Sequence, residues 1–166
     1  MENGKMQYSL ENNTLKLSVK KPPFFVRVTF YFFTVIAISI PFFMTIYMIS
    51  SRVGLQFGYF IGVLLSGLIF FYFLRVSLWN TFGVEIIKFD TNSIKYEADY
   101  RWFKDGKKSI INQNIILSIL PVGYEEDKSG VLIIRNHENH IYCSSKIPID
   151  ELHIIINKLN QKLKIQ

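Results

Sequence analysis

Two long apolar runs dominate the pattern of hydrophobic and polar positions along the chain. Val28–Ser51 and Val53–Leu74 contain no charged residue, and only Arg52 lies between them. A helix that crosses a membrane needs roughly 20 mostly apolar residues, and both runs reach that length. The sequence therefore predicts a transmembrane helical hairpin over residues 24–79, with helices at about 24–51 and 53–74.

Prolines and small residues indicate how this hairpin is built. Pro22 and Pro23 precede the first helix, where proline is well tolerated, and Pro41 near its middle is expected to bend it. Small residues recur every four positions on the second helix and allow close approach; they are Gly54, Gly58, Gly62 and Ser66. This stripe packs against the first helix or against a second copy of the chain, which gives a homo-oligomer. A leucine at Gly58 or Gly62 is expected to separate the packed helices.

After Gly83 the apolar positions recur at every second residue, which is typical of half-buried strands. The clearest strand alternates charged residues with Ile94, Tyr96, Ala98, Tyr100 and Trp102. Asp105-Gly106 then predicts a hairpin turn. Other short strands are predicted at 83–89, 107–111, 115–120, 131–135 and 139–144.

The N-terminal segment, residues 1–23, allows two interpretations. Leu15, Leu17 and Val19 alternate with polar residues after Asn12-Asn13, a pair typical of a turn. The pattern predicts a strand that joins the later sheet. A flexible tail is the alternative.

Beyond Pro148 the apolar period becomes that of a helix. One helical face carries Leu152, Ile155, Ile156, Leu159 and Leu163. Acidic residues begin this helix and lysines end it, which matches the helix dipole. The helix closes the sheet domain or lies on the membrane surface; we favour the first. The predicted fold class is a membrane α-helical hairpin followed by a small α+β domain at residues 83–164, an antiparallel barrel or sandwich capped by the C-terminal helix.

Two segments resemble a known family. The run LRVSLWNTFGVE at residues 74–85 is similar to the junction of bacterial integral-membrane proteins that carry a pleckstrin-homology-like (PH-like) domain. The run YRWFKDGKK at residues 100–108 is similar to the first hairpin of that domain. The resemblance covers residues 24–164. It implies two transmembrane helices, a PH-like fold and a bacterial membrane, and it implies no activity.

Charge gives the predicted hairpin an orientation. The formal net charge is +6. Lys20, Lys21 and Arg27 flank the first helix and Arg75 follows the second, whereas the connection offers only Arg52. Positive residues near helix ends favour the cytoplasmic side, so both termini are expected in the cytoplasm of a bacterial cell, at its inner membrane. Once these anchors are set aside no basic face remains, and a nucleic-acid partner is not expected.

Two groups of residues are candidates for contact with lipids or a partner. Arg75, Trp79 and Asn80 lie at the predicted membrane interface, where arginine reaches phosphates and tryptophan sits among headgroups. The predicted hairpin is basic and aromatic, which suits anionic headgroups; its residues are Arg101, Trp102, Phe103, Lys104, Lys107 and Lys108. Ordinary interfacial anchoring and a solvated hairpin tip are the respective alternatives.

The chain contains no recognisable catalytic motif. It has no nucleophile elbow, phosphate loop, dinucleotide fingerprint or zinc-protease motif. Neither apolar run contains a charged residue of the kind that transport paths use. His137, His140 and Cys143 lack a fourth metal ligand. We therefore expect no catalytic residue, no metal and no cofactor.

The expected function is non-enzymatic. The chain is expected to present a cytoplasmic PH-like domain at the inner membrane, as a scaffold or adaptor that binds membrane lipids and an unidentified protein partner. The alternative is an immunity or assembly factor for a larger membrane complex. A lipid-modifying enzyme ranks last, with Asp99, Glu85 and His140 as its loose candidates.

Overall fold

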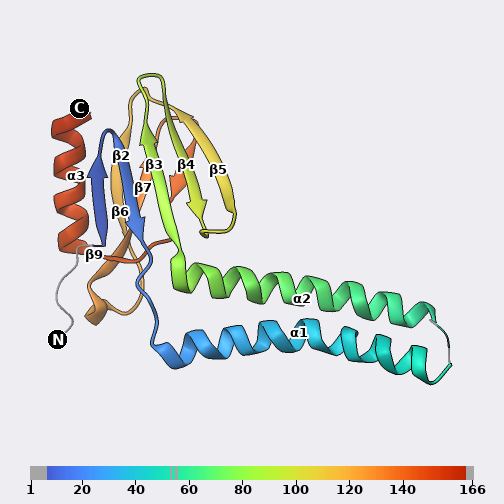
Figure 1. Ribbon diagram of the computed structural model, residues 1–166. Helices are drawn as coiled ribbons and strands as arrows, with labels where there is room; N and C mark the ends of the chain where they lie inside the picture. The colour runs from blue at the N-terminus through green and yellow to red at the C-terminus, as the bar shows by residue number, and fades with distance from the viewer. Residues whose placement is uncertain (1–6, 53, 55, 164–166) are drawn as a thin grey trace. The chain divides into compact units, whose positions relative to one another are not determined.

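The computed structural model describes residues 7–52, 54 and 56–163, which fall into two units (Figure 1). The helical unit covers Lys21–Thr81. The sheet unit combines the described residues of Met1–Lys20 with those of Phe82–Gln166. The sheet unit is thus discontinuous in sequence, because the helical unit is inserted between two of its neighbouring strands.

The helical unit consists of α1 (Phe24–Ser50) and α2 (Phe57–Phe82). Both helices are long and apolar enough to cross a membrane. Helix α2 begins later and ends later than the sequence pattern predicts. Gly54 lies before it with a positive φ of 77°, and no glycine or proline interrupts the chain between Gly67 and Gly83. The helix therefore continues through polar residues to Phe82.

A pair of hydroxyl groups and a pair of stacked rings connect the first half of α1 with the second half of α2. The Thr34 and Ser77 hydroxyls lie 3.4 Å apart, and both side chains are buried. The Phe33 and Phe73 rings stack with centroids 5.4 Å apart. Small and hydroxylated residues thus provide a close contact here, at positions that the glycine stripe does not include.

Pro41 creates a gap in the backbone hydrogen bonding of α1 that α2 fills. Proline has no N–H, so the carbonyl of Ala37, four residues earlier, loses its helical donor. The Ser66 hydroxyl donates a hydrogen bond to that carbonyl. A neighbouring helix thereby satisfies a group that would be costly to leave unpaired in an apolar medium.

This contact predicts a specific coupling between two substitutions. Ser66→Ala should lower the stability of the full-length protein in detergent by about 1 to 2 kcal/mol. In a Pro41→Ala background, where the substituted alanine supplies the missing N–H, Ser66→Ala should cost much less. Thermal unfolding of the four proteins measures the coupling, and equal costs in both backgrounds would contradict the proposed pairing.

Five antiparallel strands form the first sheet in the order of the sequence: β1 (Tyr8–Glu11), β2 (Thr14–Ser18), β3 (Val84–Phe89), β4 (Ser93–Asp99) and β5 (Lys104–Ile111). Asn12 and Asn13 both have positive φ, as a tight hairpin turn requires. Leu15 and Leu17 are fully buried in the core. The predicted N-terminal strand is confirmed, and the flexible-tail alternative is wrong for the described residues.

The second sheet contains β6 (Ile116–Pro121), β7 (Ser129–Arg135), β8 (His140–Tyr142) and β9 (Ile147–Pro148). Strand β7 pairs with β6 over its length and with both β8 and β9. A short 3-10 helix, Glu125–Asp127, lies between β6 and β7.

Helix α3 (Ile149–Leu163) follows β9 and contacts β6, β7 and β9. Leu152, Ile155 and Leu159 are buried, and they join a core to which both sheets contribute. Ile156 packs against this core while partly exposed, and the Leu163 side chain lies outside the described residues. The apolar face predicted for the C-terminal helix is confirmed for its described positions.

Candidate functional site

The hairpin between β4 and β5 turns earlier than the sequence pattern predicts. Asp99 pairs with Lys104, and the Tyr100 N–H donates to the Phe103 carbonyl at 3.0 Å. The Asp99 carboxylate accepts a hydrogen bond from the Arg101 N–H at 2.7 Å, which supports the positive φ of Arg101. The predicted turn at Asp105-Gly106 is therefore wrong.

Gly106 instead forms a bulge inside β5. The register passes from Tyr96–Lys108 to Ala98–Asp105, so two residues of β5 lie opposite the single residue Glu97. Gly106 has a φ of 65°, and glycine at positive φ is typical of this kind of bulge. The same glycine conformation that suggests a turn is used here to insert an extra residue into a strand.

Three aromatic or basic residues form the hairpin tip, which we define as Arg101, Trp102 and Phe103. Trp102 is 70% exposed. The Phe103 ring stacks on Tyr100 with centroids 4.7 Å apart. The Arg101 guanidinium lies over the ring of Phe82, 4.6 Å from its centroid. The tip therefore presents an exposed indole on a turn held by a stacked ring and a cation–π contact.

Phe82 connects the tip to the end of α2. It is the last residue of that helix and belongs to the sheet unit. Arg75, Trp79 and Asn80 lie on the final turns of α2, and each is partly exposed. Among the sequence-predicted hairpin residues, Arg101 contacts Phe82, within the sheet unit.

The lysines of the predicted hairpin do not gather at the tip. Lys104 forms an ion pair with Glu97 at 2.7 Å and lies 3.9 Å from Asp99. Its hydrogen bond to Glu97 raises the pKa of Lys104 and lowers the pKa of Glu97. Lys107 is the second residue of the bulge, and Lys108 follows it on β5. The predicted basic and aromatic cluster is thus divided between the turn and the strand.

A buried carboxylate occupies the core side of β3. Glu85 is fully buried and accepts hydrogen bonds from the Tyr96 hydroxyl at 2.6 Å, the Ser144 N–H at 2.6 Å and the Ser145 N–H at 2.9 Å. Burial, followed by the charge of Glu85, raises the pKa of Tyr96 above its ordinary value of 10.0, so the phenol stays a donor at neutral pH. The Glu85 carboxylate is thus the acceptor for three donors in the core.

The three residues considered as catalytic candidates, Glu85, Asp99 and His140, each make contacts within the sheet unit. Glu85 attaches the segment after β8 to β3, and Asp99 supports the hairpin turn. The exposed His140 ring contacts the Tyr142 ring edge-on, with centroids 4.7 Å apart. Glu85 is closed to solvent, so a substrate cannot reach its carboxylate in this conformation.

The three residues that resemble metal ligands differ in their surroundings. His137 and His140 are exposed, whereas Cys143 is buried. Burial, and then the charge of Glu85, raises the pKa of the Cys143 thiol, which disfavours the thiolate that binds metals. Within the described part of the chain, no group of three or more His, Cys, Asp or Glu residues could hold a metal ion.

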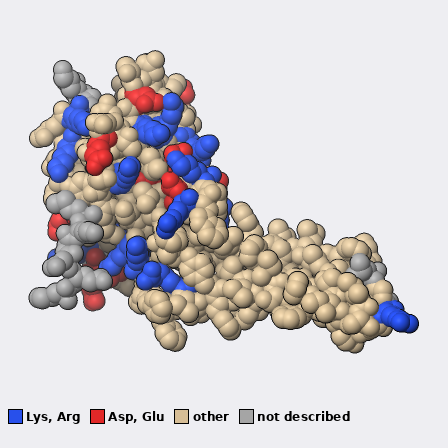
Figure 2. Space-filling view, in the orientation of Figure 1, with Lys and Arg blue, Asp and Glu red and all other residues tan. Residues whose placement is uncertain are grey.

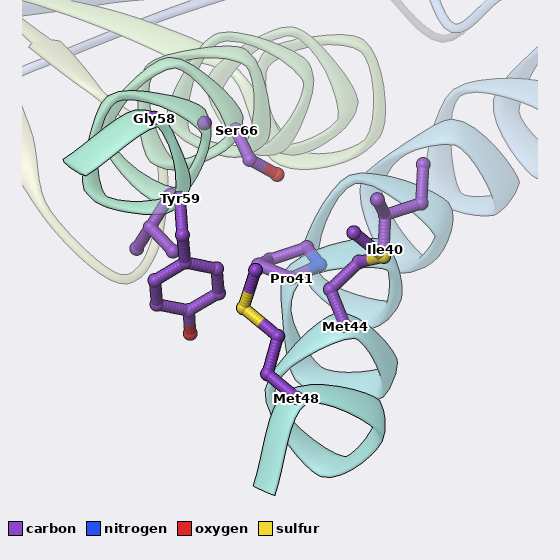
Figure 3. Close-up of a pocket in the computed structure, with 9 residues that line it drawn as sticks. Ile40, Pro41, Met44, Met48, Gly58, Tyr59 and Ser66 are labelled. Carbon is purple, nitrogen blue, oxygen red and sulfur yellow. The ribbon is translucent and has the colours of Figure 1, made fainter. Parts of the chain in front are cut away.

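The small-residue stripe of α2 faces a cavity rather than a packed surface. Gly58, Gly62 and Ser66 line a space of about 300 Å³ together with Pro41 and methionines of α1 (Figure 3). A Cβ added to Gly58 or Gly62 would meet nothing within 4 Å. Of the stripe, only Ser66 has a hydrogen bond to α1 among the described residues. Close approach at the glycines is therefore not used within this hairpin.

Comparison of the chain with family models, with curated proteins and with solved structures finds no match. The function is therefore argued from the two apolar helices, the hairpin tip and the charges of the sheet unit. Basic and acidic side chains are interspersed over the sheet unit, whereas the two helices carry almost none (Figure 2).

Proposed function

We propose that this protein is a two-helix anchor of the bacterial inner membrane that presents a PH-like binding domain to the membrane surface and to a protein partner. The domain acts as a scaffold or adaptor and catalyses no reaction. The observation that carries this proposal is the exposed Trp102 on a turn whose Arg101 rests on Phe82, the residue at which α2 ends.

The apolar surface of the two helices supports insertion in a membrane. Helix α1 has two buried residues and α2 has two, and most of the large apolar side chains of both helices are exposed. A core helix of a soluble protein would have that surface covered by other elements. Lipid acyl chains are the medium that suits it without further protein contacts.

The sheet unit supports the PH-like assignment through its layout. Antiparallel strands in two sheets are followed by one C-terminal helix whose buried face contacts the second sheet. In the sequence, the two PH-like segments fall at the end of α2 and at the β4–β5 hairpin. The proposal assigns a binding role because PH-like folds present loops and sheet faces for partners, and function must come from those surfaces.

The position of Arg101 supports membrane contact by the hairpin tip. Phe82 is the last residue of α2 and belongs to the sheet unit, so the Arg101 guanidinium over its ring lies beside the residue at which that helix ends. Tryptophan prefers the headgroup region of a bilayer, where its ring meets apolar and polar surroundings together. Arginine can bind the phosphates of the same region. Arg75 and Trp79 on the last turns of α2 have the same chemistry.

Fluorescence quenching tests this membrane contact. The chain has two tryptophans, so Trp79→Phe leaves Trp102 as the single reporter, and Trp102→Phe leaves Trp79 as a matched comparison. In nanodiscs that contain lipids brominated near the headgroup, we expect quenching of both single-tryptophan proteins. Trp102 emission that is unchanged by brominated lipid and fully accessible to acrylamide would overturn the tip contact.

The orientation is a separate prediction that rests on the basic residues at the helix ends. Lys20, Lys21 and Arg27 precede or begin α1, and Arg75 lies near the end of α2, so both termini are predicted to be cytoplasmic. Single cysteines test this, because the native Cys143 is only 3% exposed. Gln56→Cys, before α2, should react with an impermeant maleimide in intact cells. Gln113→Cys, between β5 and β6, should react only after permeabilisation, and the reverse result would invert the topology.

A further inference from the structure

A groove lined by lysines crosses the outer face of the first sheet. Its volume is about 350 Å³, and strands β3, β4 and β5 contribute its walls. The polar residues of this lysine groove are Lys88, Lys95, Glu97, Lys107, Lys108 and Ser109. Lys95 is four residues from the end of β4 at Asp99, or about 13 Å at the rise of a strand. The groove is therefore a surface separate from the hairpin tip.

Strand register explains why like charges meet here. Lys88 and Lys95 are directly opposite each other on β3 and β4, and a like-charge pair at such positions is destabilising. The bulge at Gly106 interrupts the usual alternation of β5. Lys107 is the second of the two residues opposite Glu97 and shares its outer face, whereas Lys108 pairs with the buried Tyr96 and lies on the core-facing side of β5.

Only part of this positive charge is neutralised by the protein. Lys95 pairs with Asp90 at 2.7 Å, and Glu97 pairs with Lys104 at 2.7 Å. Lys88 and Lys107, which lie on the outer face, have no ion pair with any residue that the structure describes. Their two ammonium groups are thus unneutralised beside a groove whose one lining carboxylate, Glu97, already pairs with Lys104.

We propose that the lysine groove binds a phosphate-bearing ligand, with the ammonium groups of Lys88 and Lys107 as its charged contacts. Ammonium groups bind phosphate oxygens as point charges, and the Ser109 hydroxyl adds a neutral donor. Ile86 also lines the groove and provides apolar contact for the organic part of a phosphate ester. A multiply charged anion relieves the repulsion between lysines that the sheet register imposes.

The same chemistry is available from a soluble phosphate compound and from the headgroup of an anionic phospholipid. The groove site does not depend on the tip contact proposed above, since the two surfaces share no residue. A ligand in the groove would make the binding domain responsive to a second signal while α1 and α2 keep it at the membrane.

Full-length protein in a neutral detergent tests the site with two probes. The soluble probe is pyrophosphate. The lipid probe is dihexanoyl phosphatidic acid below its critical micelle concentration, and dihexanoyl phosphatidylcholine is its control. Binding is followed by the thermal midpoint and by the amide resonance of Ser109. We expect one or both anionic probes to raise the midpoint and shift this resonance, whereas the phosphatidylcholine probe should do neither.

Matched variants distinguish the groove from general charge. Lys107→Gln, and separately Lys88→Gln, should weaken binding about tenfold or more, because each removes charge-assisted hydrogen bonds. Lys162→Gln removes the same charge from an exposed position on α3 and should bind as the parent does. Trp102→Phe, a tip variant, should also bind normally.

The outcomes separate the ligand sources and the two proposals. Lysine-dependent binding of pyrophosphate assigns a soluble phosphate compound, and lysine-dependent binding of phosphatidic acid alone assigns a lipid headgroup. Absence of binding by both probes, or binding that the substitutions of Lys88 and Lys107 do not affect, overturns the site. Loss of tip quenching with retained groove binding would remove the membrane contact and leave the groove intact.

Discussion

Replacing Glu85 with alanine is expected to lower the free energy of unfolding of the sheet unit by about 3 to 5 kcal/mol. The substitution removes the acceptor of three hydrogen bonds. It leaves two backbone N–H groups, those of Ser144 and Ser145, without the acceptor that they have in the folded protein. Unpaired buried donors are costly because they lose water without gaining a partner.

Glu85→Gln should have a smaller effect, about 1 to 3 kcal/mol. The amide keeps one acceptor oxygen, but its NH₂ group replaces the second one and faces a donor. Glu138→Ala is the matched control, because Glu138 is exposed and the bonds given for it involve its backbone N–H. Its cost should stay within about 0.5 kcal/mol.

Two measurements on the full-length protein in detergent check this prediction. Urea unfolding gives the free-energy change, and hydrogen exchange reports the amides of Ser144 and Ser145 individually. In the alanine variant these two amides should lose protection before the strand amides of β3 do. Retained protection at both amides would show that Glu85 does not hold the segment between β8 and β9.

This segment illustrates what the sequence pattern does not predict. Residues 139–144 read as one continuous strand, yet β8 ends at Tyr142 and β9 begins at Ile147. The chain leaves the sheet between them because Glu85, about 60 residues earlier, binds the two amides there. The sequence did contain one signal for this contact. Glu85 is an acidic residue at a core-facing position of the strand predicted at 83–89, which is β3.

Local periodicity was sufficient for most of the elements. The strands that read as alternating patterns and the two apolar helices all form, although α2 ends at Phe82, eight residues later than the predicted end at residue 74. The β4–β5 hairpin differs because Asp-Gly suits both a turn and a bulge, and local sequence does not distinguish them. The Asp99 carboxylate, which accepts the Arg101 N–H, decides the turn four residues earlier.

The contacts within the helical unit also depend on long-range pairing. A stripe of small residues indicates where another helix could approach closely. In the described hairpin, however, Ser66 of this stripe serves as a hydrogen-bond donor to α1. Ser66 satisfies the carbonyl that Pro41 leaves unpaired, which requires knowing which residues of α1 and α2 are opposite each other. The proline is visible in the sequence, whereas its partner is not.

Leu159→Ala is expected to destabilise the sheet unit by about 2 to 5 kcal/mol, because it removes buried methyl groups and leaves a cavity. Leu159 is fully buried, as are its neighbours on the same face of α3, Leu152 and Ile155, at 0% and 1% exposure. The matched control is Ile154→Ala on the opposite face of the helix, where Ile154 is 42% exposed. That change should cost no more than about 0.5 kcal/mol.

The difference between Leu159→Ala and Ile154→Ala also tests whether α3 packs on the second sheet or lies on the membrane. A helix lying on the membrane would use its apolar face for lipid, and truncating Leu159 would then leave the strands of the sheet unit unaffected. The experiment needs the full chain, because β1 and β2 supply core residues and precede the helical unit. Urea unfolding and hydrogen exchange of β6 and β7 amides in detergent provide the measurement. If Leu159→Ala unfolds like Ile154→Ala, α3 does not close the second sheet, and the PH-like proposal loses the helix on which its layout depends.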